Sequence, residues 1–358
     1  MTHPITAAEV TVPVDDLKTE MPFFLDRFGF QLDEIYPADD PAVALISGHG
    51  LRLRLERGAP GGPLHLRLRA TDPTFAGATS PSGHMVEVVD ANPALTIPET
   101  HHQFLVRHLI DSDAWVIGRA GMQYRDLIPD RLGGSIIASH IRIPDGGPVP
   151  DMVHYHVVGF QLIFCLNGWV RLVYEDQGDP FILKAGNCVI QPPQIRHRVL
   201  EASDNVEVLE IGVPAEHLTA IDHDMNLPNG GLNPDRDWDG TRFIHFKADT
   251  TPWTPWRIPG WEAQDTGIGA ATSGVAGVQV ARPVAGADPV WSAHDTDILF
   301  SFVKKGCMTL EATGEAPRAL VAGDAFVIPP FLKTRYSNAS ADCRLIETAL
   351  KADFTTRL

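Results

Sequence analysis

The C-terminal two thirds of the chain contain the same pattern of turns twice. Gly168 and Gly186 in the first copy correspond to Gly306 and Gly323 in the second, with 17 and 16 residues between the glycines. Each second glycine begins a matching phrase, GNCVIQPP in the first copy and GDAFVIPP in the second. Self-similarity of this kind predicts an internal duplication, so we expect one fold to occur twice in the chain.

Glycine and proline interrupt the sequence too often for long helices. The 358 residues include 31 Gly and 29 Pro, scattered every few positions. Short segments between frequent turns are typical of β-rich proteins. Because a chain of this length can form two or three domains, we expect a mainly β fold with more than one core.

The charge balance bears on the partners of the protein. With 29 Lys and Arg against 45 Asp and Glu, the formal net charge of −16 would repel a nucleic-acid backbone or an anionic membrane. The first ten residues lack the basic and apolar regions of a signal peptide, and no run of about eighteen apolar residues occurs. We therefore expect a cytoplasmic protein that acts on a small-molecule substrate, without nucleic-acid or membrane partners.

The cysteines give no sign of a disulfide framework. Cys165, Cys188, Cys307 and Cys343 form no Cys-x-x-Cys pair and lie mostly in apolar contexts typical of strands. Such positions predict buried thiols rather than disulfides or a zinc cluster.

Residues 1–95 contain the clearest helical pattern in the chain. Val10–Val14 is typical of a short strand, and apolar residues then recur at helical spacing up to Gly29. We expect Thr19 to be the N-cap of this helix, which would place Pro22 in its first turn. Further strands are predicted at residues 30–36, 42–47, 51–56, 64–69 and 84–89.

This order of one strand, one helix and three strands resembles the βαβββ module of the glyoxalase/bleomycin-resistance (vicinal oxygen chelate) family. The resemblance places metal ligands at Glu9 and at Arg54 or Glu56, and those of a second module at His65 and Glu87. About 14 residues between the last two strands are too few for the helix and middle strands of a second module. A structural or dimerising role is therefore expected for this unit in place of metal binding.

The sequence His154-Tyr155-His156 lies between a glycine pair and an apolar run. On a strand, residues two apart point to the same face, so both imidazoles can converge on one ion while Tyr155 points away. Gln161 follows on the apolar run, and His197 follows the turn marked by Pro192. The alternative is a histidine-lined core whose rings bond to their own backbone.

This arrangement resembles the two-part signature of the cupin family, G-x5-H-x-H-x(3,4)-E-x6-G and G-x5-P-x-G-x2-H-x3-N. The corresponding residues here are Gly147, His154, His156, Gln161 and Gly168 in the first part, and Gly186, Pro192 and His197 in the second. The first spacing is one residue longer, and Gln161, Gln194 and Glu201 replace the family's Glu, Gly and Asn. The resemblance implies a mainly β fold of two cupin (double-stranded β-helix or jelly-roll) barrels, preceded by the small α+β βαβββ-like unit.

The resemblance also implies one divalent metal ion, held by His154, His156, Gln161 and His197. A glutamine oxygen can ligate a hard divalent ion but brings no charge, so the site would carry a net charge of about 2+ and act as a strong Lewis acid. Open positions would admit water, substrate or dioxygen. We expect Fe2+, with Zn2+, Ni2+ or Mn2+ as alternatives.

The second copy lacks most of these ligands. Aligned on the glycines, Ser292, His294, Leu299 and Thr334 stand for His154, His156, Gln161 and His197. A lone histidine rarely holds a catalytic ion, so we expect a structural barrel, unless the nearby Asp295 and Asp297 restore a site. The expected domains are the glyoxalase-like unit (1–95), the metal-binding barrel (96–220), a linker that packs its tryptophans on the barrels (221–262) and the second barrel (263–358).

Several polar residues near the first motif are candidates for binding substrate. His140 and Arg142 share one face of a strand and could meet a substrate carboxylate if that face lines the barrel interior. Arg171, Tyr174 and Gln191 are similar candidates, and a solvent-facing or structural role is the alternative for each of them. His101 and His102 are expected at the surface.

Three functions are compatible with this reading. The first is an Fe2+-dependent dioxygenase acting on a small oxygen-rich or enolisable organic acid. The second is a non-redox isomerase, cyclase or lyase, in which the ion polarises a carbonyl and a side chain moves a proton. The third is a non-catalytic protein that binds a small molecule. Exposed barrel edges also predict a homodimer.

Overall fold

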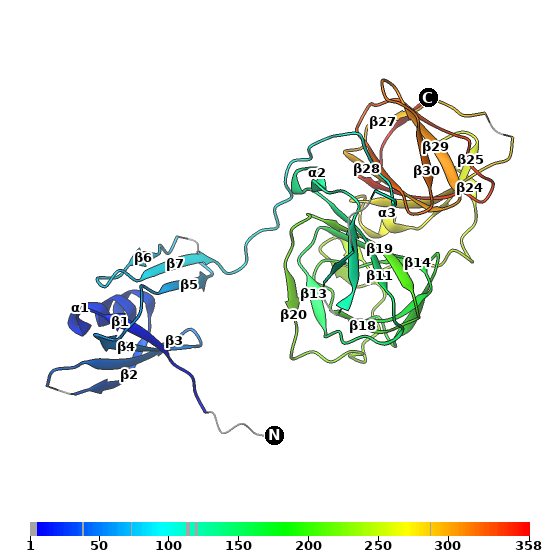
Figure 1. The fold of residues 1–358 in the computed structure, drawn as a ribbon. Coiled ribbons are helices and arrows are strands. Elements are labelled where there is room, and N and C mark those ends of the chain that lie inside the picture. The colour runs from blue at the N-terminus through cyan, green and yellow to red at the C-terminus, as the bar shows by residue number, and fades with distance from the viewer. Residues whose placement is uncertain (1–5, 38, 73, 112–114, 119–120, 287) are drawn as a thin grey trace. The chain divides into compact units, whose positions relative to one another are not determined.

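The computed structural model describes residues 6–37, 39–72, 74–111, 115–118, 121–286 and 288–358. The chain forms two compact units, Met1–Ala94 and Leu95–Leu358. Strands account for 46% of the structure and helices for 6%, which confirms the expected mainly β fold (Figure 1).

The first unit is built on a four-stranded sheet of order β1-β4-β3-β2, in which β1 and β4 are parallel. Its elements are β1 (Val10–Val14), α1 (Leu17–Pro22), η1 (Phe23–Arg27), β2 (Gln31–Tyr36), β3 (Val43–Gly48) and β4 (Leu51–Arg57). The helical segment begins one turn earlier than predicted, because the side chain of Asp16, not Thr19, accepts the hydrogen bond from the backbone N–H of Lys18.

A second, three-stranded sheet completes this unit. It has the order β5-β7-β6 and consists of β5 (His65–Ala70), β6 (Ala78–Thr79) and β7 (Met85–Asp90). The core of the unit gathers Phe24 and Phe28 from the helical segment with Leu53 and Leu55 from β4. Leu53 and Leu55 alternate with Arg52 and Arg54, so β4 is buried on one face only.

The first barrel of the second unit consists of two facing sheets. The seven-stranded sheet has the order β23-β17-β14-β19-β11-β10-β9 and the other sheet the order β16-β15-β18-β13-β20, with β12 paired to β18. The bounds are β9 (Val116–Ile117), β10 (Gln123–Asp126), β11 (Ile137–Ile143), β12 (Gly147–Pro148), β13 (His154–His156), β14 (Phe160–Asn167), β15 (Trp169–Tyr174), β16 (Phe181–Lys184), β17 (Cys188–Ile190), β18 (His197–Ala202), β19 (Val206–Val213), β20 (Thr219–Ile221) and β23 (His245–Phe246).

The second barrel repeats this arrangement. Its sheets have the orders β24-β25-β26-β33-β28-β31-β8, β30-β29-β32 and β27-β34. The bounds are β8 (Leu105–Arg107), β24 (Thr254–Pro255), β25 (Trp261–Asp265), β26 (Gly277–Pro283), β27 (Ala293–His294), β28 (Ile298–Lys305), β29 (Cys307–Ala312), β30 (Arg318–Val321), β31 (Ala325–Ile328), β32 (Thr334–Ser337), β33 (Arg344–Leu350) and β34 (Thr356–Arg357). A hairpin of β21 (Asp237–Trp238) and β22 (Thr241–Arg242) and two short helices, α2 (Arg131–Gly134) and α3 (Ile268–Ala271), complete the unit.

Strand register confirms the internal duplication. Gln161 on β14 faces Gly212 on β19, and its counterpart Leu299 on β28 faces Ala349 on β33. Both pairs of strands then have a bulge at the same place, between Cys165 and Asn167 and between Val303 and Lys305. The two copies therefore align residue by residue along these strands.

The repeated glycines are required by the backbone. Gly168 and Gly306 have φ angles of 69° and 73°, in the left-handed region. A Cβ at Gly168 would lie 2.3 Å from the hydroxyl of Ser203, and one at Gly306 would lie 2.4 Å from the hydroxyl of Ser340. Each glycine thus allows the same tight turn against the same type of side chain.

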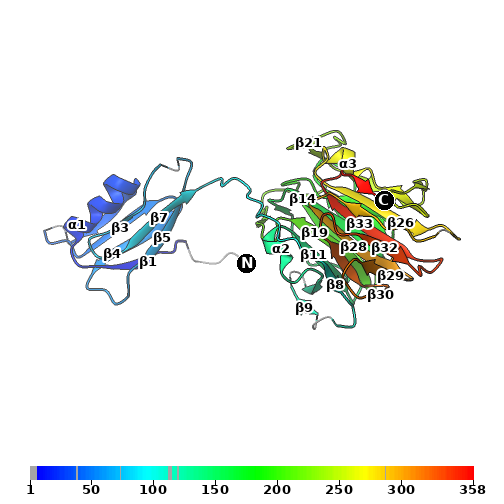
Figure 2. The same ribbon diagram turned by 90° about the horizontal axis from the view of Figure 1, so that it is seen from above.

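The two barrels share one apolar core. Phe160, Leu162 and Phe164 on β14 pack with Phe300 and Phe302 on β28 in a single buried cluster. Figure 2 shows the strands β11, β14 and β19 beside β28 and β33. Because stacked sheets bury the side chains between them, one face of each large sheet is covered by the sheet of the other barrel.

The segment expected to link the barrels is packed onto both of them. Trp238 is buried in the core of the first barrel, and Trp256 and Trp261 are buried in the core of the second. The cysteines follow the sequence prediction with one exception. Cys165, Cys188 and Cys343 are buried free thiols, whereas Cys307 is exposed because it begins β29 with its side chain outward.

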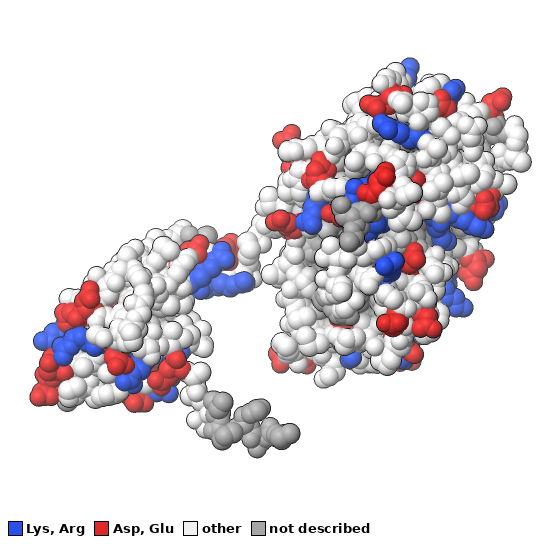
Figure 3. Space-filling view, viewed as in Figure 1, with Lys and Arg blue, Asp and Glu red and all other residues white. Residues whose placement is uncertain are grey.

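None of the helices in the described ranges could cross a bilayer. On the face drawn in Figure 3, acidic and basic side chains are interspersed over the described residues. Opposite charges in such a mixture compensate one another locally.

A buried arginine ties the first barrel to the second. Arg125 on β10 donates hydrogen bonds to the carbonyl oxygen of Gly323 at 2.6 Å and to Nδ1 of His140 at 3.0 Å. His140 must then donate from Nε2 to the carboxylate of Glu207, at 2.8 Å. Burial lowers the pKa of Arg125 to about 10, so the guanidinium remains charged at neutral pH.

We expect Arg125→Met to lower the free energy of unfolding by about 2–3 kcal/mol, because a buried carbonyl and an imidazole lose a charged donor. The matched control is Arg142→Met on the adjacent strand, which removes a partly exposed arginine and should cost less than about 1 kcal/mol. Denaturant unfolding of both variants measures the difference. Equal losses for the two variants would contradict the role of Arg125.

Candidate metal centre

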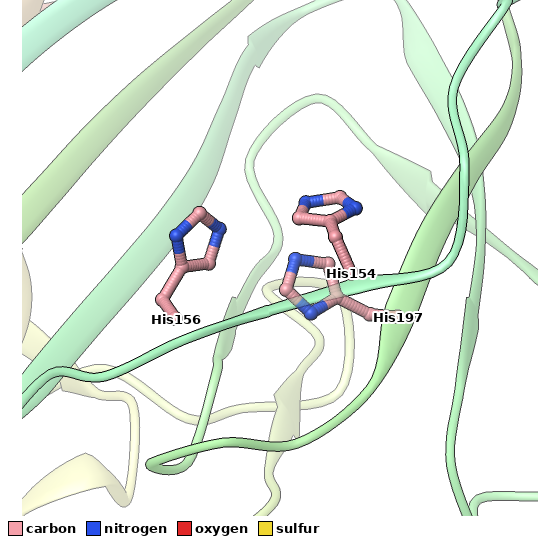
Figure 4. Close-up of side chains that lie close together, drawn as sticks. All are labelled: His154, His156 and His197. Carbon is pink, nitrogen blue, oxygen red and sulfur yellow. The ribbon is translucent and has the colours of Figure 1, made fainter. Parts of the chain in front are cut away.

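Three histidines converge inside the first barrel. His154 and His156 lie on β13 with their rings on one face, and His197 lies on β18, directly opposite His154 in the strand register. All three are buried, and their potential ligand atoms lie within 4.8 Å of one another (Figure 4). Tyr155 points away and stacks under the guanidinium of Arg196, 4.1 Å from its ring centre. The side chains of this strand therefore alternate between its two faces, as predicted.

The hydrogen bonds of these rings select one nitrogen for ligation. Nδ1 of His154 donates to the carbonyl of Met152 at 2.8 Å, and Nδ1 of His197 donates to that of Ile195 at 3.0 Å. Because a carbonyl oxygen only accepts, both neutral rings carry their lone pair on Nε2. Nδ1 of His156 is held by the hydroxyl of Thr219 at 2.8 Å. Partners of this kind orient metal-binding histidines in proteins.

Gln161 lies on β14 with its side chain in the same barrel. Its amide nitrogen donates to the carboxylate of Glu210 on β19 at 2.7 Å. Its amide oxygen is buried and has no hydrogen-bond partner among the described residues. An unsatisfied buried oxygen is costly, and a cation would satisfy it. The bond to Glu210 thus presents the oxygen of Gln161, not its NH2 group, as the ligand atom.

The histidines line a cavity with mostly aliphatic walls. Its volume is about 70 Å³, room for several water molecules or a compact ligand. The aliphatic walls include Ile141, Ile143, Ile163, Val170, Leu172 and Val199. The polar residues on the lining are the three histidines, Tyr124, Tyr174, Gln191 and Glu210.

Tyr174 and Gln191 lie in this cavity as a hydrogen-bonded pair. The amide of Gln191 donates to the hydroxyl of Tyr174 at 3.0 Å, and the Tyr174 ring stacks on His197. Burial raises the pKa of Tyr174 well above its ordinary value, so the phenol keeps its proton. That proton can be donated to a bound molecule. Two of the five residues predicted to bind substrate therefore line this cavity.

The other three point away from the cavity. Along β11 the cavity is lined by Ile141 and Ile143, so His140 and Arg142 lie on the opposite face. His140 packs against Phe302 of the second barrel, and Arg142 donates to Gln123. Arg171 pairs with Glu201 on the outside of the barrel, because the lining residues of β15 are Val170, Leu172 and Tyr174. The expectation that these three bind substrate is wrong.

Gln194 shows why the family signature has glycine at that place. Its φ angle is 62°, in the left-handed region, as is that of its counterpart Phe331 at 68°. A residue with a side chain is strained there by about 1–2 kcal/mol, and the turn persists because the flanking strands hold it. The turn still brings His197 to the site, so this departure from the signature leaves the ligand in place.

In the second barrel the residues at the corresponding positions make other contacts. Ser292 and Thr334 are bridged as His154 and His197 are, but neither carries a ring. Nε2 of His294 donates to the carbonyl of Ile328 at 3.1 Å, and burial, followed by the charge of Arg257, lowers its pKa to about 4. Asp295 accepts from the backbone of Thr355, outside any cluster.

His102 and Thr100 bind the remaining acidic candidate, Asp297, at 2.8 and 2.7 Å. That carboxylate fastens the segment before β8 to the second barrel. As expected, His101 and His102 are exposed. Among the described residues, only the three histidines of the first barrel form a potential metal-binding group of His, Cys, Asp and Glu side chains.

An ion pair occupies the interior of the second barrel. Glu347 on β33 is the counterpart of Glu210 and is 4% exposed, and its carboxylate accepts two hydrogen bonds from Arg257, one of them at 2.8 Å. Burial by itself lowers the pKa of Arg257, but Glu347 more than offsets this and holds the pKa above its ordinary value. The carboxylate inside this barrel is therefore neutralised by a side chain of the protein itself.

Sequence reasoning missed Glu210 and Thr219. Glu210 lies between Leu209 and Ile211 on a strand whose other charged residue is Glu207, and an acidic side chain in this apolar setting was the available signal. Thr219 lies on a short edge strand whose pairing with β13 has no local sequence signal.

In the first unit, Glu9 pairs with Arg52, Glu56 pairs with Arg54, and His65 and Glu87 are exposed. The positions named by the glyoxalase resemblance thus form ordinary surface ion pairs.

The first-barrel residues fit a divalent metal ion. Three imidazoles and an amide oxygen are a mixed nitrogen and oxygen donor set that suits first-row transition metals. The orphaned oxygen of Gln161 supports the fit, because it is buried where only a cation or a donor would satisfy it. Glu210 supplies a negative charge close to the ligands, which a site of neutral ligands alone would lack.

Comparisons with known proteins support the fold. No family model matches the sequence, and no curated protein matches it. Salicylate 1,2-dioxygenase from Pseudaminobacter salicylatoxidans is similar in structure, with a TM-score of 0.55 and 14% identity over 73% of this chain and 90% of that one. Oxalate decarboxylase from Bacillus subtilis has a TM-score of 0.52 and 12% identity over 73% of this chain and 80% of that one.

Protein Ylba from E. coli has a TM-score of 0.52 and 10% identity over 74% of this chain and 96% of its own. The chain therefore shares the fold of cupin proteins, with two barrels of this class. Identities this low show a common fold, but they do not show a common activity. The comparisons show no glyoxalase-like N-terminal unit, so that resemblance remains a prediction.

We expect Arg257→Met to destabilise the protein by about 3–5 kcal/mol, because Glu347 would remain as a buried, unpaired carboxylate. The double variant Arg257→Met/Glu347→Leu should recover most of this loss, since it removes both charges. Arg335→Met is the control, because Arg335 pairs with Glu311 at the surface and should cost at most about 1 kcal/mol. Thermal or denaturant unfolding measures all three, and a double variant as unstable as the single one would contradict the expectation.

Proposed function

We propose that the first barrel is the active site of a metal-dependent enzyme, an Fe2+-dependent dioxygenase that acts on a small enolisable compound. The observation that carries this proposal is the buried group of three histidines on the lining of a mostly aliphatic cavity, together with the orphaned Gln161 oxygen in the same barrel. Dioxygen is itself apolar and is accommodated by aliphatic walls. Salicylate 1,2-dioxygenase, whose fold is similar, is named as a dioxygenase.

His154, His156, His197 and Gln161 would hold the ion. When bound, Fe2+ would supply Lewis acidity toward substrate oxygens and electrons toward dioxygen. Zn2+, Ni2+ and Mn2+ are alternatives with the same ligands. The second barrel is assigned no ion, because Arg257 already neutralises its interior carboxylate.

The chain's own residues prepare the substrate. The aliphatic walls exclude bulk water from the reacting atoms. The Tyr174 hydroxyl accepts from Gln191 and directs its own proton toward a substrate oxygen, where it stabilises developing negative charge. Glu210 lies on the same lining and can hold a proton taken from an enolisable carbon.

A non-redox isomerase, cyclase or lyase is the second candidate. One observation favours it: a carboxylate, Glu210, and a protonated phenol, Tyr174, line the same cavity and could move a proton between two positions of a substrate. This chemistry needs the Lewis acidity of the ion but no dioxygen.

The wider setting of the enzyme is also proposed. We assign a small molecule as its partner, in place of nucleic acid or a membrane, because the net charge is −16. A cytoplasmic location and a homodimer are proposed from the sequence features described above. Gel filtration with light scattering would test the dimer.

Protein purified without added metal should contain about one divalent ion per chain, and His156→Ala should lose most of it, because two imidazoles rarely retain a catalytic ion. His217→Ala is the matched control: the His217 ring lies 5.5 Å from that of His156 but outside the metal-binding group. Elemental analysis measures the ion content of each. Full metal content in His156→Ala would show that the ligands are wrongly assigned.

The dioxygenase proposal predicts oxygen consumption. Protein loaded anaerobically with Fe2+ should consume dioxygen when it is admitted together with enolisable substrates, as measured with an oxygen electrode. Turnover by the Zn2+ or Ni2+ form under argon would instead support the isomerase or lyase. A metal-loaded enzyme that neither consumes oxygen nor turns over under argon would overturn both candidates.

A further inference from the structure

The walls of the first-barrel cavity restrict the charge that a ligand can carry. Among the described lining residues there is no lysine or arginine, and most of the surface is aliphatic. A charged group placed against aliphatic walls loses its hydration without gaining a partner. The positive charge available to a ligand is therefore that of the metal alone.

The neighbouring arginines do not compensate for this. Arg142 and Arg171 alternate with lining residues and point out of the barrel, where their partners are Gln123 and Glu201. Arg125 is directed toward Gly323 of the second barrel. Reaching the cavity would require each of these side chains to pass through its own sheet.

Glu210 makes the restriction stronger. Its carboxylate lies on the cavity lining and accepts the hydrogen bond from Gln161. On the cavity lining, this carboxylate and a divalent ion together leave about one net positive charge, enough for a ligand that becomes a monoanion by losing one enol proton. A dianion would bring excess negative charge into a low-dielectric space beside this carboxylate.

We infer that the first-barrel site selects small enolisable dicarbonyl compounds with uncharged, alkyl flanks and rejects dicarboxylates of the same size. The inference rests on the proposed function and names its substrate class. Two oxygens of such a compound would face the ion and the Tyr174 hydroxyl, and its alkyl groups would contact Ile141, Leu172 and Val199. The expectation from the sequence, a small oxygen-rich or enolisable organic acid, is thereby narrowed to enolisable compounds without carboxylate groups.

Acetylacetone and malonate form a matched pair of probes. Both present two oxygens across one carbon, and they differ in that two methyl groups of the first are carboxylate oxygens in the second. Isothermal titration of the Zn2+-loaded full-length protein measures binding without redox turnover. We expect acetylacetone to bind at least about tenfold more tightly than malonate, with monomethyl malonate between them.

The variant Glu210→Gln should reduce this preference at least about threefold by tightening malonate binding, because one negative charge leaves the cavity. Glu201→Gln, outside the barrel beside Arg171, is the matched control and should leave the preference unchanged. Malonate binding as tightly as acetylacetone to the metal-loaded protein, or neither probe binding to it, would overturn the inference and leave the proposed metal enzyme standing. Failure of the protein to retain metal in the elemental analysis would overturn the proposed function and the inference with it.

Discussion

The two faces of β14 set the constraint on which the rest of the structure depends. Phe160, Leu162 and Phe164 are buried between the barrels, and Gln161 and Ile163 alternate with them on the cavity side. A shift of register by one residue would exchange the two sets and place an amide in the core and phenyl rings against the histidines. The shared core therefore fixes the height at which Gln161 enters the barrel, and through it the position of Glu210 across the strand pair.

The second barrel contributes to the site without bearing a ligand. It covers the outer face of the sheet whose inner face lines the cavity, so that the central strand β14 has buried apolar residues between the barrels. Arg125 and His140 extend the same contact into a buried polar network. A polar network of this kind is stable only when each member is satisfied, and the carbonyl of Gly323 in the second barrel completes it.

Local patterns in the sequence were sufficient for the strands, the duplication and the grouping of the three histidines. The His-x-His spacing on one strand and the glycine turns are properties of neighbouring residues, and the structure places them as predicted. The orientation of a strand face is a different matter. His140 and Arg142 share a face, but whether that face is inside or outside depends on the second barrel, which lies far away in the sequence. Glu210, Thr219 and the N-cap Asp16 were likewise fixed by contacts across strands or by competition between adjacent capping residues.

Arg257 makes the charge balance inside the second barrel independent of any bound ion. Its guanidinium neutralises Glu347 from within the chain, so a chelator cannot extract that charge and a shortage of metal ions in the cell cannot lower its occupancy. The packing of this half of the second unit against the other half therefore does not depend on a bound ion for its charge balance.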